Sequence, residues 1–380
     1  EAALAQEDAD DLSLPETAAT NLPLPARGAN GSDIAWASSD EAVIAPDGTV
    51  TAPGAGEEDV TVTLTASVRF VDGPVVTRAF DVKVLAQREV LEDSGLGVRM
   101  DDDYLRNGLQ KEHEYLLSLS SEKFLYWWYR TAGLTPTTAE GYAGWENGNT
   151  ANNFRGHAFG HYLSGLAISY ANTTDGATRS AMLEQLTDGV SGLAEVQASY
   201  AGKPDAYAGT ADGYLAPFRT KAFSNIEGRG AGDPAANDPV IVPYYNLHKV
   251  LQGLLDVSRY VGGETGATAL DVAHQLGRYL GRRMNTLADK AQMRGTEYGG
   301  MNEALYDLYE QVGGDPLVLD AAEAFDEVSL FTTVANGGDP LAGRHANTTI
   351  PKFIGALKRY TVFTQNPDLF AQLTPQEQAE

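Results

Sequence analysis

Cysteine is absent from the 380 residues of this chain. These residues therefore offer no disulfide, no thiolate zinc site and no cysteine nucleophile. Basic residues are scarce as well, with 27 Lys and Arg against 52 Asp and Glu, which gives a formal net charge of −25. A surface of this charge repels phosphate groups and anionic lipid headgroups, so we expect neither nucleic acid nor an anionic membrane as a partner. The composition suits a protein that handles a neutral ligand.

Long apolar runs are missing too. No segment reaches the stretch of about 20 apolar residues that spans a bilayer, so we predict no membrane span. The chain starts with EAALAQEDADDLSLP, which has neither the basic nor the apolar region of a signal peptide. We expect a signal peptide to be absent or already removed.

The first quarter of the chain has the pattern of β-strands. Side chains alternate between apolar and polar over residues 59–70 and again over residues 77–85. The pair Asp47-Gly48, between two short apolar segments, is a strong hairpin signal. Short strands at this spacing predict a small all-β sandwich over residues 9–86.

Other features of this first part complete the prediction. Residues 1–8 are acidic and small, so we expect a disordered lead-in. Trp36 and Phe80 are expected in the core of the sandwich rather than on a sugar-binding surface. Residues 87–98 are expected to form a linker to a second domain.

From about residue 99 the apolar period changes from two to 3.6, which indicates helices. We predict an all-α second domain over residues 99–380, built from successive helix pairs. Its architecture is expected to be a helical toroid of the (α/α)6 type. The predicted helices cover residues 104–119, 157–172, 180–200, 246–262, 267–287, 299–312, 318–329 and 348–363.

Four of these helices begin in the same style, with His, Tyr, Asn or Glu in the first turn and apolar residues after it. The segments are GHAFGHYLSGLA, YYNLHKVLQGLL, YGGMNEALYDLY and RHANTTIPKFIGAL. In a toroid the inner helices direct their first turns to one end of the central cavity. Free backbone N–H groups there favour oxygen-rich ligands. We therefore predict a binding pocket at this end.

Histidines supply several candidates for that pocket. His157 and His161 stand four residues apart on one helical face, so a shared metal, a sugar ligand and a structural role are all open. A shared metal is the weakest of these three alternatives. A zincin would need glutamate directly after the first histidine, and this chain has Ala158 there. His248 and His345 each begin an apolar helix and are candidates for ligand binding or for a structural role. His113 and His274 lie inside amphipathic helices, and we expect an ordinary surface or core role for both.

Three other residue types could contribute. Glu303 lies on an otherwise apolar helix face, where desolvation would raise its pKa and suit a general acid; a buried ion pair is the alternative. Asn302 could bind ligand or cap its helix. Trp145 could stack on a sugar or pack beneath its own loop. Glu146 could be a second acid of the site, as glycoside hydrolysis uses carboxylate pairs, or a solvated surface residue.

The helix-start motifs resemble a known family. GHAFGHYLSGLAISYA, GYLAPF, VPYYNLHKVLQGLLD, EYGGMNEALYDLY and GRHANTTIPKFIGALKRY occur in the order found in β-L-arabinofuranosidases of glycoside hydrolase family 127 and its relative family 146. The match covers about residues 98 to 365. The segment before it resembles the atrophied bacterial immunoglobulin-like modules of secreted arabinan-degrading enzymes.

The resemblance implies an (α/α)6 barrel, an extracellular or cell-surface location, and release of terminal β-L-arabinofuranose with retention of configuration. An L-arabinofuranose-containing carbohydrate is the implied partner. The family nucleophile is a cysteine thiolate held on zinc by three Cys and one Glu, with a separate Glu as acid/base. His345 matches a substrate-contacting histidine of the family, while His161, His248 and Glu303 match motif positions whose roles are less defined. His157 and His161 are expected to line the rim of the sugar pocket.

The sequence departs from the family in one respect. The acid/base motif and the cysteine ligands would lie beyond Glu380, so we expect the toroid to be incomplete at its C-terminus and this chain alone to be inactive. No cofactor is expected in these residues, and zinc is expected in the complete enzyme. An open barrel would expose apolar helix faces, which predicts self-association. A non-catalytic carbohydrate-binding protein, and another toroidal sugar enzyme that uses His and Glu, remain alternatives.

Overall fold

The structure is a computed structural model that describes residues 1–18, 21–54, 58–86, 100–149, 153–229, 240–374 and 378. It divides into two compact units, Glu1–Glu92 and Asp93–Glu380. The linker predicted at residues 87–98 lies outside the described residues.

The first unit contains one four-stranded sheet, in the order β1-β4-β3-β2. Strands β2, β3 and β4 are antiparallel neighbours, and β1 is parallel to β4. The register sets Val62 opposite Val82 and Leu64 opposite Phe80, so the apolar side chains of both strands share one face. The strands are β1 (Thr17–Ala18), β2 (Asp33–Ser38), β3 (Val60–Arg69) and β4 (Val76–Val84).

Helix α1 (Ala2–Asp10) covers one end of this face, which corrects the expectation that residues 1–8 are disordered. Ala5 and Ala9 are fully buried against β3, because their small side chains let the helix lie close to the sheet. The guanidinium of Arg78 donates at 2.6 Å to the carbonyl of Ala9 and at 2.6 Å to the next carbonyl. It thereby satisfies acceptors that a helix C-terminus leaves free.

Only one of the two sheets of the predicted sandwich is observed among the described residues. Among the described residues no second sheet faces the first, and turns with one isolated bridge, Ile44 to Val50, cover the rest of the apolar face. The predicted turn is there: Gly48 has a φ of +88° and its N–H donates to the carbonyl of Ala45 at 2.9 Å. The rings of Trp36 and Phe80 lie 5.8 Å apart and pack on the core, as predicted.

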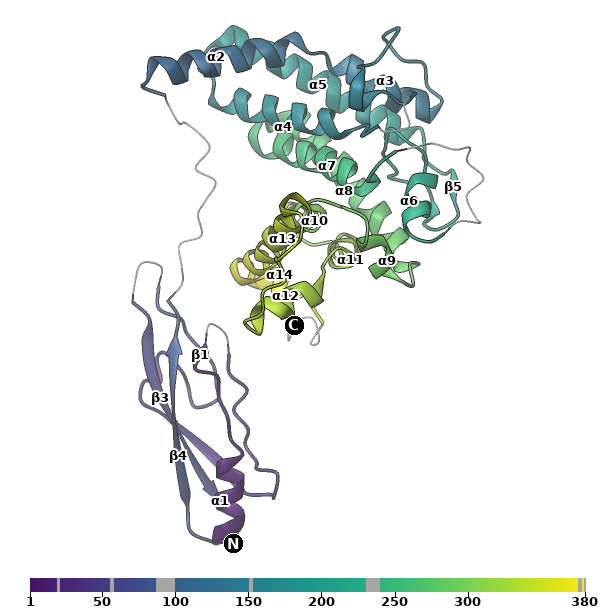
Figure 1. The fold of residues 1–380 in the computed structure, drawn as a ribbon. Coiled ribbons are helices and arrows are strands. Elements are labelled where there is room, and N and C mark those ends of the chain that lie inside the picture. Colours follow the sequence, from purple (N-terminus) through teal and green to yellow (C-terminus); the bar gives the residue numbers. More distant parts are fainter. Residues whose placement is uncertain are drawn as a thin grey trace. The chain divides into compact units, whose positions relative to one another are not determined.

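The second unit is mostly helical (Figure 1). Its longer helices are α2 (Asp103–Ser118), α3 (Ser121–Ala132), α4 (His157–Asn172), α5 (Gly176–Ala198), α7 (Pro243–Tyr260), α8 (Gly263–Asn285), α10 (Met301–Gln311), α11 (Pro316–Ala324), α12 (Val328–Ala335) and α13 (Ala346–Gln365). The short elements are η1 (Gly144–Glu146), β5 (Pro204–Asp205), β6 (Gly209–Thr210), α6 (Lys221–Ile226), α9 (Lys290–Arg294) and α14 (Pro367–Phe370).

Seven of these helices pack as two rows. Helices α4, α7, α10 and α13 follow one another in the first row, and α5, α8 and α11 form the second. Each helix of the second row packs against the first-row helix that precedes it in sequence, α5 on α4, α8 on α7 and α11 on α10. Two rows of alternating helices are the part of the predicted toroid that the structure shows. Closure into an (α/α)6 ring stays a prediction.

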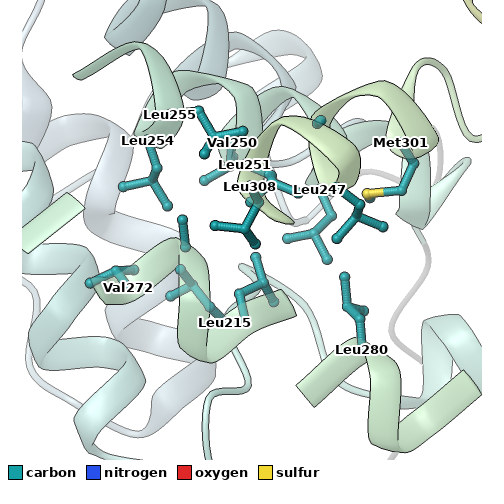
Figure 2. Packing of buried hydrophobic residues seen from close by; sticks show 14 of the residues in the cluster. Leu215, Leu247, Val250, Leu251, Leu254, Leu255, Val272, Leu280, Met301 and Leu308 are labelled. Atoms are coloured by element: carbon teal, nitrogen blue, oxygen red, sulfur yellow. The ribbon is translucent and has the colours of Figure 1, made fainter. Parts of the chain in front are cut away.

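Apolar side chains from both rows fill the space between them. Figure 2 shows Leu247, Leu251 and Leu254 of α7 facing Leu308 of α10 and Val272 of α8. These residues are at most 2% exposed, so helix α7 is the centre of the core. Its polar first turn is thereby held in one place.

Candidate functional site

The first turns of α4 and α7 lie side by side. His157, the first residue of α4, has its Nε2 atom 3.3 Å from the hydroxyl of Tyr245, and the two rings stack with centroids 5.3 Å apart. The His161 ring centroid is 4.7 Å from that of His157. Residues 88 positions apart in the sequence therefore lie at one site. This agrees with the expectation that the inner helices direct their first turns to the same end.

Two glycines explain how the helices come so close. A Cβ atom at Gly160 would lie 2.1 Å from the carbonyl carbon of Lys249, and one at Gly253 would lie 2.7 Å from the carbonyl oxygen of Gly160. No other residue fits at this crossing without moving a backbone. The glycines thus bring the histidines of α4 against the first turn of α7.

The chain enters α7 through strained backbone. Val242 has a φ of +48°, a left-handed conformation that is uncommon for a β-branched residue. The preceding residue is fixed, because Ile241 donates its N–H to the Asn153 carbonyl at 3.0 Å and accepts at 2.7 Å from the Asn246 amide. The Val242 carbonyl itself accepts from the N–H of Asn246 at 3.1 Å. Such strain persists where the surroundings over-determine it, and it is concentrated at functional sites.

The segment before α10 completes the site from a third helix. A Cβ atom on Gly300 would lie 3.1 Å from Oε2 of Glu303 and 3.3 Å from Nε2 of His248. A Cβ atom on Gly299, whose φ is +61°, would lie 2.8 Å from Nδ1 of His248. The paired glycines therefore let His248 and Glu303 converge on one point.

The histidines of the site are neutral at pH 7. Burial, with the nearby His161 and Lys249, lowers the pKa of His157 to about 4. Burial and Lys249 also lower the pKa of His161, and burial holds the pKa of His248 well below its usual range. Each neutral imidazole offers one donor and one acceptor nitrogen, which matches the hydroxyl groups of a sugar. Nδ1 of His248 is buried and has no hydrogen-bond partner among the described residues.

Glu303 contributes a carboxyl group to this cluster. Burial raises its pKa and the Asp307 carboxylate raises it further, while Lys358 and Lys249 oppose the shift. Burial in turn lowers the pKa of Lys249, against the pull of Glu303 and Glu297. The ammonium of Lys249 lies 4.7 Å from the Tyr245 ring centroid. A carboxyl that holds its proton at higher pH, next to neutral imidazoles, can donate a hydrogen bond or a proton.

Trp145 belongs to element η1 and lies beside His157, the first residue of α4. The indole is 57% exposed, its ring centroid is 5.6 Å from that of His157, and the two rings meet edge to face. The next residue, Glu146, is buried and accepts hydrogen bonds from the N–H groups of Gly156 at 2.8 Å and Ala158 at 2.7 Å. The alternative that Glu146 is a solvated surface residue is therefore wrong, and its carboxylate occupies the N-terminus of α4.

His345 lies at the start of α13 and is exposed, with Nδ1 3.2 Å from the Thr348 hydroxyl. Two residues later, the Asn347 amide donates to Glu297 at 2.9 Å. This bond ties the start of α13 to the segment that precedes α10. His345 thus stands near the same end of the helices, while no contact joins it to the other three candidate histidines.

Asn302 does not face the site. Its amide donates to Asp326 at 2.9 Å and to the carbonyl of Lys352 at 3.2 Å, and the residue is fully buried. A Cβ atom on Gly355 would lie 2.2 Å from its side chain. Asn302 therefore joins α10 to α13, and neither of its two predicted roles, ligand binding or helix capping, is observed.

Within the described residues no group of three or more His, Cys, Asp and Glu side chains could hold a metal ion. The sequence also has no cysteine, so these residues do not fit a zinc site of three Cys and one Glu. Of the described helices, none combines the length and the apolar character that crossing a membrane requires.

Sequence reasoning missed Tyr245 and Lys249 as members of the site. A signal was present, because the residues 245, 248 and 249 recur at the i, i+3 and i+4 spacing of one helical face. It also missed that Glu146 is buried, which no local pattern reveals. The ordinary structural role expected for His274 is confirmed, because its Nε2 atom lies 2.9 Å from Oδ2 of Asp315.

Two protein-family models match this chain. The family model described as β-L-arabinofuranosidase, GH127 catalytic domain, matches residues 97–374, and the model of the atrophied bacterial Ig domain matches residues 2–87. Comparison with curated proteins gives no match. The chain belongs to the glycoside hydrolases of the GH127 β-L-arabinofuranosidase family, with an atrophied bacterial Ig domain at its N-terminal side.

Proposed function

We propose that the side chains gathered at the first turns of α4, α7 and α10 bind the terminal β-L-arabinofuranose of a glycan, as part of a retaining glycosidase. The observation that carries the proposal is the convergence of His157, Tyr245, His248 and Glu303 from three helices. The family match supports a glycoside as the ligand. The net charge of −25 is compatible with a neutral sugar and unfavourable for an anionic one.

Each group has a part in this proposal. The neutral imidazoles of His157, His161 and His248 exchange hydrogen bonds with the sugar hydroxyls, because each has one donor and one acceptor nitrogen. His345 closes the same pocket from the start of α13. Glu303 lies next to the sugar, and burial raises the pKa of its carboxyl, which favours a role as hydrogen-bond or proton donor. The family's chemistry uses a zinc-bound cysteine thiolate, which these residues do not contain.

The test is hydrolysis of p-nitrophenyl β-L-arabinofuranoside by the 380-residue chain, with zinc content measured on the same sample. We expect neither turnover nor bound zinc, because the chain has no thiolate to act as nucleophile. Turnover by this chain would contradict the thiolate mechanism and would make Glu303 and the histidines the reacting groups. A Glu303→Gln variant would then decide whether the Glu303 proton is required.

Binding without turnover is the second candidate function for these residues. It is favoured by one observation, the absence of cysteine from a chain that carries the histidines and the carboxyl group proposed to bind the sugar. Saturable sugar binding without turnover by this chain fits both candidate functions. An activity assay distinguishes them only when the cysteine-bearing residues of the family are supplied. An extracellular location stays a prediction.

A further inference from the structure

Trp145 is an aromatic side chain fixed at the edge of the proposed pocket with much of its surface uncovered. It is 57% exposed. A single exposed apolar side chain is ordinary in a protein and by itself indicates nothing. What distinguishes Trp145 is the way in which its neighbours hold it in that position.

The chain is anchored at Trp145 and at the residue that follows it. Its carbonyl accepts from the N–H of Phe154 at 2.8 Å, and the carboxylate of Glu146 takes two N–H bonds at the N-terminus of α4. Further along the loop, Gly148 lies against the Trp127 ring, where a Cβ atom would approach to 2.8 Å. Residues 145–148 are therefore held so that the indole has little freedom to fold inward.

The ring itself is positioned by two aromatic neighbours. Its centroid lies 4.6 Å from that of Phe154, at an interplanar angle of 33°, and 5.6 Å from that of His157, at 78°. Phe154 and His157 thus both contact the indole, and His157 connects it to His161. Aromatic rings held in this way offer a flat apolar surface with little entropy to lose on binding.

We propose that Trp145 is the stacking surface for the second unit of the glycan, the one to which the terminal β-L-arabinofuranose is attached. This inference rests on the proposed function. The C–H face of a sugar ring is apolar and matches an indole, while its hydroxyl edge remains in water. Since His157 separates Trp145 from His161 and His248, the indole lies outside the group that binds the first sugar. Trp145 then determines which glycans are preferred and leaves the recognition of arabinofuranose to the histidines.

The experiment is isothermal titration with two ligands, methyl β-L-arabinofuranoside and a disaccharide whose non-reducing unit is β-L-arabinofuranose. Wild-type protein is expected to bind the disaccharide about tenfold more tightly, the order of magnitude of one aromatic stacking contact. Trp145→Ala is expected to remove that difference and to leave the affinity for the methyl glycoside unchanged. Trp145→Phe, which keeps a flat ring, is expected to restore part of it.

A matched control is Tyr104→Ala, which removes an aromatic side chain that is 83% exposed on α2. It should leave both affinities as in the wild type, and thermal melts of all variants establish that they are folded.

If Trp145→Ala keeps the disaccharide preference, the inference is overturned while the proposed function stands. If it weakens both ligands equally, Trp145 belongs to the first-sugar pocket and the inference is again overturned. If the wild type binds neither ligand, the proposed function itself fails.

Discussion

Glu146 shows how a single buried carboxyl can organise a site. Burial raises its pKa from 4.5 to about 7, although the N–H bonds from Gly156 and Ala158 act in the opposite direction. The same two bonds fix the start of α4, and with it His157. Its protonation state and the geometry of the pocket are therefore linked.

This link predicts a pH dependence of stability. Between pH 4.5 and about 7 the folded state binds a proton at Glu146 that the unfolded state has released, so the free energy of unfolding falls as the pH rises. The shift corresponds to at most about 3 kcal/mol across that window. Urea unfolding at several pH values measures it, and Glu146→Gln should lose this part of the slope. Parallel pH profiles for the two proteins would contradict the assignment.

At the scale of elements, the site depends on the crossing of α4 and α7. Gly160→Ala places a methyl group 2.1 Å from the Lys249 carbonyl carbon and forces the helices apart. We expect a loss of about 1–3 kcal/mol in unfolding free energy, the usual effect of overpacking, together with weaker sugar binding.

The matched control is Gly108→Ala within α2, where a Cβ atom meets nothing within 4 Å. There we expect a gain of up to about 1 kcal/mol, because alanine is the better helix former. Urea denaturation of both variants makes the comparison. Equal stability of Gly160→Ala and the wild type would show that α4 and α7 do not cross as closely as the structure has them.

Helix α4 was predictable from the sequence to the residue, since its apolar period begins at His157 and ends at Asn172. The start of α7 was predicted at residue 246, but the helix begins at Pro243, a residue suited to the first helical position. The role of Asn302 could not be predicted, because its partners lie 24 and 50 residues away on other segments. Local pattern thus gives the helices, and tertiary contacts decide which polar side chains face the pocket.

At the scale of the whole molecule, a four-stranded unit precedes two rows of helices, and the residues that could bind a sugar lie at one end of the first row. The family match covers this helical unit almost entirely. The Ig-like unit supplies none of the candidate side chains. The proposed sugar binding therefore involves side chains of the helical unit.

The most direct test of this account is calorimetric titration of methyl β-L-arabinofuranoside into the wild type and into His157→Ala, with His113→Ala on α2 as the control. We predict saturable binding to the wild type and to the control. The affinity of His157→Ala should be about 3- to 10-fold lower, the effect of one lost hydrogen bond. Absence of binding to the wild type, or equal affinities for the wild type and His157→Ala, would contradict a sugar pocket at the first turns of α4 and α7.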